Sequence, residues 1–226
     1  MTPRLLAEEA DWLWLYKPAG LPVFPLHADG SAPCLLAWLL AERPQQRSSF
    51  PQGFEGGIAH RLDNPTSGVV LAARSMEALA FARAAFASGA LRKTYRLLSH
   101  KAVPWRENHV TTPIAHHPDR RDRMVVQRGA STPHRGKWYP ADTYFRQLEG
   151  PLWEAVILTG VTHQIRVHAA SVGLALAGDK LYGGGPPRDG APAPFALHHV
   201  GLSGLSEGAP RCEPPAWWAR FSAPGA

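Results

Sequence analysis

The chain has 226 residues, of which 45% are hydrophobic, enough for a buried core in one large domain or two small ones. Lys and Arg number 24 against 18 Asp and Glu, and the formal charge of +6 favours polyanionic partners such as nucleic acid. No apolar run is long enough to cross a bilayer, and acidic residues lie where a signal peptide would be apolar, so we expect a cytoplasmic protein without a membrane partner. Cys34 and Cys212 lie outside any C-x-x-C pattern and indicate packed or surface thiols, which argues against a disulfide framework or a zinc ribbon.

The first part of the chain alternates apolar runs with turn residues. In chain order we predict a strand at 11–17, a helix capped by Ser31 that runs to residue 41, a loop at 43–57, a strand at 69–73 and a helix capped by Ser75 that ends at Gly89. The strand at 11–17 ends because Pro18-Ala19-Gly20 breaks it.

The second part continues the same mixture of elements. We predict a strand at 92–99, a long excursion with little core at 105–139, strands at 141–148 and 152–158, a helix capped by Thr162 and closed by Gly173, and a last strand at 195–200. Tyr95 and Leu97 share one face of the strand at 92–99. Trp217 and Trp218 should pack the end of the chain against the core. Because strands and helices do not alternate regularly, we predict an α+β fold.

A single acid stands out in the stretch GIAHRLDNPTSG at residues 57–68. Pro65 pushes Asn64 toward extended geometry, and Pro-Thr-Ser-Gly makes a tight return, so Asp63 should lie on a rigid turn before the next strand. Rigid loops that display one polar residue often carry catalysis. The structural alternative is that Asp63 caps this turn and pairs with Arg61.

Arg166 offers a partner for this acid. It lies in the first turns of the helix after Thr162, where the helix dipole disfavours a cation, so a nearby anion is expected. Asp63 is a candidate for that anion, and such a pair would keep the carboxylate ionised as a nucleophile or base requires. The alternative is an exposed Arg166 that contacts only solvent.

Other kinds of site find little support. His163 and His168 are five residues apart without an H-E-x-x-H pattern, and the histidines at 116, 117 and 134 lack the spacing of a closed metal site. No G-x-S-x-G of a hydrolase and no phosphate-binding P-loop is present. The sequence therefore indicates a site without metal or cofactor, built on one aspartate.

Four motifs occur in one order along the chain: HRLD with TSG, KTYRLL, THQIRVH and GDKLYGG. In order and spacing they resemble the RluA-type pseudouridine synthases, from about residue 60 to residue 184, and YKPAGLPV resembles the family's opening strand and loop. The resemblance implies an α+β catalytic fold with a central mixed, mostly antiparallel sheet, flanking helices and a basic cleft. It also implies conversion of uridine to pseudouridine within RNA, without cofactor or metal.

The resemblance assigns roles to individual residues. Asp63 matches the essential aspartate, which attacks the flipped uridine or takes a proton from its ribose, and Tyr95 matches the tyrosine that stacks on the target base. Arg166 matches the basic partner of the aspartate, and Arg61 resembles the arginine that enters the stack where the uridine leaves it. The expected contacts with RNA come from Arg61, His60, Thr66 and Gln164. The segment RRDR at 120–123 is either a further phosphate-binding patch or a solvated charge run.

Some positions depart from the family pattern. Val161 stands where a basic residue usually precedes THQIR, which removes one expected contact, and Leu174-Ala175 replaces the common HP. The segment HADG at 27–30 also differs from the usual loop, but none of these changes affects Asp63.

We therefore expect one catalytic domain over residues 1–226, without an appended N-terminal RNA-binding domain, acting as a monomer on ribosomal or transfer RNA. A competing hypothesis is a non-catalytic RNA-binding or chaperone module on the same scaffold, which Val161 favours slightly. A hydrolase that uses Asp63 as a base would instead release free uracil.

Overall fold

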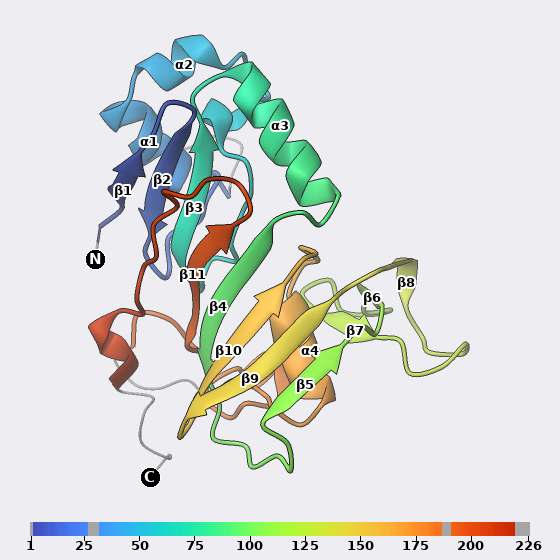
Figure 1. The fold of residues 1–226 in the computed structure, drawn as a ribbon. Coiled ribbons are helices and arrows are strands. Elements are labelled where there is room, and N and C mark those ends of the chain that lie inside the picture. The colour runs from blue at the N-terminus through green and yellow to red at the C-terminus, as the bar shows by residue number, and fades with distance from the viewer. Residues whose placement is uncertain (1, 27–31, 187–190, 220–226) are drawn as a thin grey trace. The chain divides into compact units, whose positions relative to one another are not determined.

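A computed structural model describes residues 2–26, 32–186 and 191–219 (Figure 1). The chain forms two compact units. The first comprises Met1–Leu91 and His198–Pro214, and the second comprises Arg92–Leu197 and Pro215–Ala226. The first unit is thus completed by a segment that follows Arg92–Leu197, the larger part of the second unit, in sequence.

The first unit is a four-stranded mixed sheet with helices. Its strands are β1 (Arg4–Glu8), β2 (Trp12–Lys17), β3 (Ser67–Ala73) and β11 (Leu197–Ser203), in the order β1-β2-β3-β11. Its helices are α1 (Leu35–Glu42), α2 (Gln45–Ser49), the 3₁₀ turn η1 (Glu55–Gly57) and α3 (Met76–Ala87). Strands β1, β2 and β3 pair antiparallel, whereas β11 pairs parallel with β3. The strands predicted at 11–17 and 69–73 are confirmed, but β1 was not predicted.

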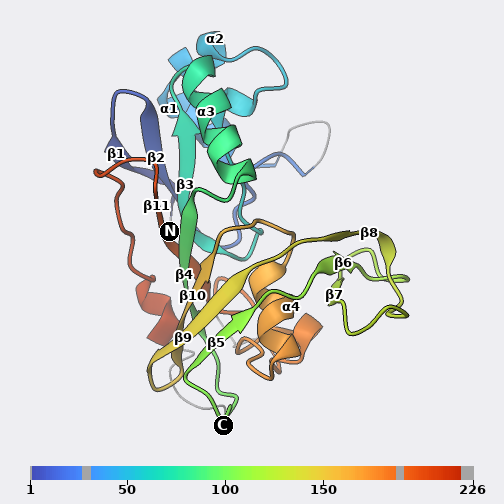
Figure 2. The same cartoon turned by 45° about the vertical axis from the view of Figure 1, so that its right-hand side comes forward.

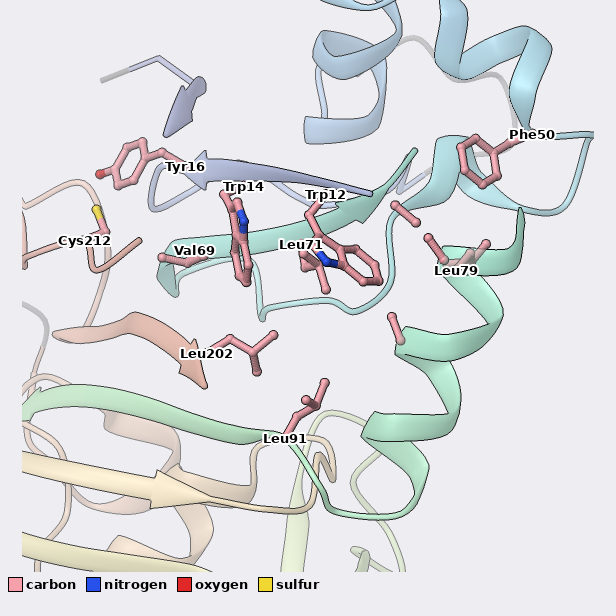
Figure 3. Packing of buried hydrophobic residues seen from close by; sticks show 13 residues of the cluster. Trp12, Trp14, Tyr16, Phe50, Val69, Leu71, Leu79, Leu91, Leu202 and Cys212 are labelled. Atoms are coloured by element: carbon pink, nitrogen blue, oxygen red, sulfur yellow. The ribbon is translucent and has the colours of Figure 1, made fainter. Parts of the chain in front are cut away.

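The core of this unit lies around β2 and β3, which are buried over their whole length (Figure 3). Trp12 and Trp14 of β2 pack with Leu71 of β3, Leu79 of α3 and Leu202 of β11. Strands buried on both faces read as continuous apolar runs, which is why WLWLY and VVLAA were recognisable from sequence.

The helix starts of this unit were only partly predicted. The Ser75 hydroxyl accepts from the Ala78 N–H and caps α3, as expected. The cap of α1 is Cys34, whose Sγ accepts from the Ala37 N–H, and Ser31 lies outside the described residues. The loop predicted at 43–57 was wrong, since α2 and η1 lie there. Gln46 of α2 is buried, and its amide donates to two main-chain carbonyls, which a polar sequence does not reveal.

The second unit has a four-stranded antiparallel sheet of β4 (Arg92–Leu98), β10 (Leu152–Ile157), β9 (Thr143–Glu149) and β5 (Glu107–Val110), in that order. Its helical elements are α4 (Gln164–Ser171) and the 3₁₀ turns η2 (Lys180–Tyr182) and η3 (Ala216–Trp218). Helix α4 packs against β9 (Figure 1). Trp218 packs on Leu98 and Ala196, which confirms the predicted anchoring of the chain end.

A second, three-stranded sheet lies beside α4 (Figure 2). It is made of β7 (Met124–Val126), β6 (Ile114–His116) and β8 (Arg135–Tyr139), in that order. The excursion with little core predicted at 105–139 was therefore wrong. Ile114, Met124 and Val126 are buried against Val167 and Tyr182. Strands of three residues are too short to show a period, and their core partners lie far away in sequence.

Helix α4 begins one residue later than the predicted cap. His163, in the left-handed region at φ +55°, is the N-cap, and Thr162 is exposed. The end at Gly173 is confirmed, since its φ of +83° suits only glycine without strain. Together the two units confirm an α+β fold with mostly antiparallel sheets. None of the helices in the described segments is both long and apolar enough to span a membrane.

Candidate active site

Asp63 lies on a rigid turn directly before β3. The Thr66 N–H donates to the Asp63 carbonyl at 3.0 Å, and the Gly20 N–H donates to the neighbouring Asn64 carbonyl at 2.9 Å. The turn predicted from Pro65 is therefore present. The residue is half-buried, so its backbone is held by the first unit while part of its surface remains accessible.

A buried lysine holds this turn in place. The Lys17 ammonium, fully buried at the end of β2, donates to the Asn64 carbonyl at 3.1 Å and to the carbonyls of Pro18 and Leu21 at 3.0 and 2.8 Å. Burial lowers the pKa of Lys17 from 10.5 to about 7, and the Asp63 carboxylate opposes this shift. Lys17 thus connects the loop after β2 with the turn that carries Asp63.

The other end of the turn is held by β11. Burial lowers the pKa of His198 to about 4, so its ring is neutral. Its Nε2 donates to the Cys212 carbonyl and its Nδ1 accepts from the Ser67 hydroxyl, each at 2.8 Å. Next to Ser67, Gly68 has a φ of +126°, and a Cβ there would lie 2.2 Å from the His199 carbonyl oxygen. Glycine is therefore required for β3 and β11 to approach at this point.

Two predicted RNA-binding residues lie beside Asp63 and differ in their contacts. His60 is half-buried, and its Nε2 accepts from the Leu71 N–H at 3.1 Å while its ring packs on Phe86. Thr66 is only 2% exposed, and its hydroxyl has no hydrogen-bond partner within the described part of the chain. An unpaired buried hydroxyl is costly to stability, so the Thr66 hydroxyl is the better candidate of the two for a contact with a bound ligand.

Tyr95 lies on β4, opposite Ala155 of β10. It is buried and shares its face with Leu97 and Lys93, whereas Thr94 alternates to the other face, as predicted. Burial lowers the pKa of Lys93 to about 8. The strand thus places Tyr95 and the buried Lys93 on one face, two residues apart.

Arg166 on α4 is buried, so the alternative of a guanidinium that contacts only solvent is wrong. Its Nε and Nη2 donate to the two carboxylate oxygens of Asp179 at 2.7 and 2.9 Å. The guanidinium also lies 4.4 Å from the ring centroid of Phe195 and 4.9 Å from that of Tyr182. The bidentate pair, with the two ring contacts, fixes the plane of the guanidinium.

Gln164, the first residue of α4, has a structural role. Its Oε1 accepts from the Val161 N–H and the Thr159 hydroxyl, and its Nε2 donates to the Asp142 carbonyl and the Thr143 hydroxyl. These bonds connect the start of the helix to β9 and to the loop before it. A contact between Gln164 and RNA stays a prediction.

The predicted site residues divide between the two units. Arg61, which is exposed, lies in the first unit with His60, Asp63 and Thr66, and the second unit holds Tyr95, Arg166 and Gln164. The structure thus places the members of each group in the same unit. The joint site of Asp63, Tyr95 and Arg166 stays a prediction, as do the RNA contacts.

Sequence reasoning missed several residues that support these groups. They are Lys17, Asp179, Tyr182 and His198. Three of them lie in motifs noted above, since YKPAGLPV contains Lys17 and GDKLYGG contains both Asp179 and Tyr182. No signal in the sequence distinguished His198, because an adjacent pair of histidines in a strand has no fixed meaning.

Comparison with known proteins extends over most of the chain. The model of the family described as RNA pseudouridylate synthase matches residues 11–171. A relative from Nitrosomonas europaea named "Ribosomal large subunit pseudouridine synthase D" is 36% identical, covering 80% of this chain and 49% of its own length. A protein of the same name from Zymomonas mobilis is 32% identical, covering 80% of this chain and 56% of its own. The chain spans about half the length of the curated relatives it matches.

Solved structures agree on the fold. The human protein "RNA Pseudouridylate Synthase Domain Containing 4" superimposes with a TM-score of 0.72 and 21% identity, covering 96% of this chain and 90% of that one. Human "RNA Pseudouridylate Synthase Domain Containing 1" gives 0.70 and 21%, with coverage of 98% and 88%. The family match contains Asp63, Tyr95 and Arg166 within its limits. The chain therefore belongs to the RNA pseudouridylate synthase family, among its RluA-type members.

Proposed function

We propose that this chain isomerises uridine to pseudouridine within RNA. The observation that carries the proposal is the family match over residues 11–171, which includes Asp63 on a turn fixed from both sides. Lys17 holds one side of the turn and the Ser67–His198 hydrogen bond holds the other. A carboxylate whose backbone is fixed and whose surface is partly open suits a reacting group.

The proposed reaction needs no outside reactant. The bond from ribose C1′ to N1 of uracil breaks, the ring turns, and a new bond forms from C1′ to C5. The proton on C5 leaves to solvent and N1 takes up a proton, so atoms and electrons balance. Asp63 acts by attack on the ring, by attack on the sugar, or by removal of a ribose proton.

Tyr95 and Arg166 complete the proposed site. A uridine inside a helix is shielded by its neighbours, so it must be flipped out, at a cost of a few kcal/mol. Stacking on the Tyr95 ring offsets part of this cost, and Arg61 fills the gap in the stack. We assign Arg166 to the Asp63 carboxylate, and the bidentate pair with Asp179 supports this role because it prevents the guanidinium from rotating.

Ribosomal RNA is the first candidate substrate, because the curated relatives carry the name of a large-subunit enzyme. Transfer RNA is the second candidate. A basic cleft, a cytoplasmic location, a single catalytic domain and a monomeric state stay predictions.

The decisive experiment uses RNA labelled with tritium at C5 of uridine. Wild type should release tritium, Asp63→Asn should release none while still binding RNA, and Asp11→Asn, which removes an exposed acid of the same unit, should match wild type. Continued release by Asp63→Asn would overturn the assignment. A wild type that binds RNA without release would indicate a non-catalytic module, and free uracil would indicate a hydrolase.

A further inference from the structure

One short segment of the second unit carries a large surplus of positive over negative charge. Residues 116–139, called here the basic arm, contain six Lys and Arg against two Asp, a surplus of four, while the whole chain has a surplus of six. The arm includes β7, β8 and the end of β6. This concentration is not explained by the proposed catalytic residues, none of which lies in the arm.

The charges of the basic arm are presented to solvent. Arg121, Arg128, Arg135 and Lys137 are all exposed, and none forms an ion pair with any residue in the described ranges. Arg135 and Lys137 lie on β8 on either side of Gly136, whose φ is +76°. Lys137 lies 5.1 Å from the ring centroid of Tyr139, so an aromatic ring accompanies this cation on the strand. Exposed cations without a carboxylate partner can contact an anionic molecule at little desolvation cost.

The basic arm is firmly connected to the helix that carries Arg166. The three-stranded sheet packs its buried face against Val167 of α4 and Tyr182. The Tyr182 hydroxyl accepts from the Met124 N–H at 2.9 Å, and its ring lies under the guanidinium of Arg166 at 4.9 Å and that of Arg123 at 5.6 Å. Tyr182 therefore contacts both the arm and Arg166, and the three-stranded sheet lies beside α4 within the same unit (Figure 2).

The arm also carries aromatic surface. Trp138 of β8 and His134 are half-buried and stack at 4.3 Å between ring centroids. Ordered aromatic rings beside cations are typical of surfaces that bind nucleic acid, because bases stack on them while phosphates contact the cations.

We propose that the basic arm binds the phosphate backbone of the substrate RNA away from the target uridine. This inference rests on the proposed function, since it names a contact of the same enzyme with its RNA. The arm increases affinity without taking part in the chemical step. The competing structural role is that Lys and Arg on the edge strand β8 prevent it from pairing with another chain.

The test compares two triple variants with equal loss of charge. The arm variant is Arg128→Gln, Arg135→Gln and Lys137→Gln, and the control variant changes three exposed cations of the first unit: Arg47→Gln, Arg83→Gln and Arg211→Gln. Both are made in the Asp63→Asn protein, so that binding is measured without turnover. The probe is a fluorescein-labelled RNA hairpin with uridines in its loop, followed by anisotropy over a range of salt concentrations.

Each lost phosphate contact lowers the slope of log Kd against log salt by about 0.7–0.9. With three cations removed, the slope for the arm variant should be smaller by about 2–3 than that of its parent. It should bind roughly tenfold more weakly at moderate salt, while the control variant stays close to its parent. With Asp63 restored, the arm variant should show a raised KM and an unchanged kcat for tritium release.

Equal weakening by both triple variants would overturn the proposal, because total charge would then explain the binding. An unchanged slope in the arm variant would overturn it as well, and new dimers in light scattering would assign the arm to edge protection. If wild type releases no tritium but the arm variant still shows a smaller salt dependence of Kd, the proposed function fails while the arm remains an RNA-binding surface. The two ideas therefore fail separately.

Discussion

Asp179→Asn is the change that tests most directly how Arg166 is held. The two side chains are 7% and 1% exposed, so the substitution leaves a buried guanidinium without its counter-charge. Breaking a buried pair in this way costs about 3–5 kcal/mol. For a chain of this length, that loss lowers the Tm by about 6–20 °C. Tritium release should also fall, because the guanidinium loses its fixed orientation.

The assay is urea unfolding followed by circular dichroism, with Asp122→Asn as the matched control. Asp122 pairs with Arg120 on the exposed surface at 3.3 Å, and its loss should leave the unfolding midpoint unchanged. The double change Arg166→Met with Asp179→Leu should recover part of the lost stability and remain inactive. If Asp179→Asn unfolds at the wild-type midpoint, the reasoning about the buried pair is wrong.

Two further predictions concern the turn that carries Asp63. The pKa of Lys17 is about 7 in the fold and 10.5 in the unfolded chain, so the unfolded chain binds more protons between these values and stability rises with pH. Between pH 7 and pH 9 the free energy of unfolding in urea should rise by about 2 kcal/mol more for wild type than for Lys17→Met. An equal rise in both proteins would contradict the burial argument. Thr66→Val removes a buried hydroxyl without a partner, so the Tm should stay equal or rise, while the kcat/KM of tritium release falls if the hydroxyl binds RNA. A lower Tm with unchanged kcat/KM would show a purely structural role.

The strands and helices that carry a strong local signal could be predicted from the sequence. The fully buried β2 and β3 read as apolar runs, and the alternation on β4 correctly placed Tyr95 and Leu97 on one face. The cap of α3 was predictable from Ser75, because a hydroxyl at the N-cap accepts a hydrogen bond from the backbone N–H three residues later, here that of Ala78.

The elements that were missed depend on distant partners. The three-residue strands β6 and β7 are stabilised by Val167 and Tyr182, more than 40 residues further along the chain by number. Their own composition of His, Arg and Pro resembles a loop. Buried polar residues such as Gln46 are equally hidden, since their burial depends on carbonyls that only the folded chain supplies.

The site shows the same division. The helix-dipole argument correctly required an anion for Arg166, but it could not identify Asp179, which lies 13 residues away on a separate turn. Lys17 was correctly predicted as the last residue of a strand. The sequence did not show that its ammonium is buried and donates to the carbonyl of Asn64, 47 residues away. Spacing along a chain identifies the type of partner a charge needs, while the fold decides which residue fills that place.

The placement of β11 has a consequence for how the protein is made. The parallel pair of β3 with β11 and the bond from Ser67 to His198 join segments 131 residues apart. During translation the ribosome delivers Asp63 long before His198, and residues 92–197 of the second unit are synthesised in between. A nascent chain that has not reached His198 therefore has the aspartate but only one of the two supports of its turn, so the competent geometry of that acid is one of the last features that synthesis completes.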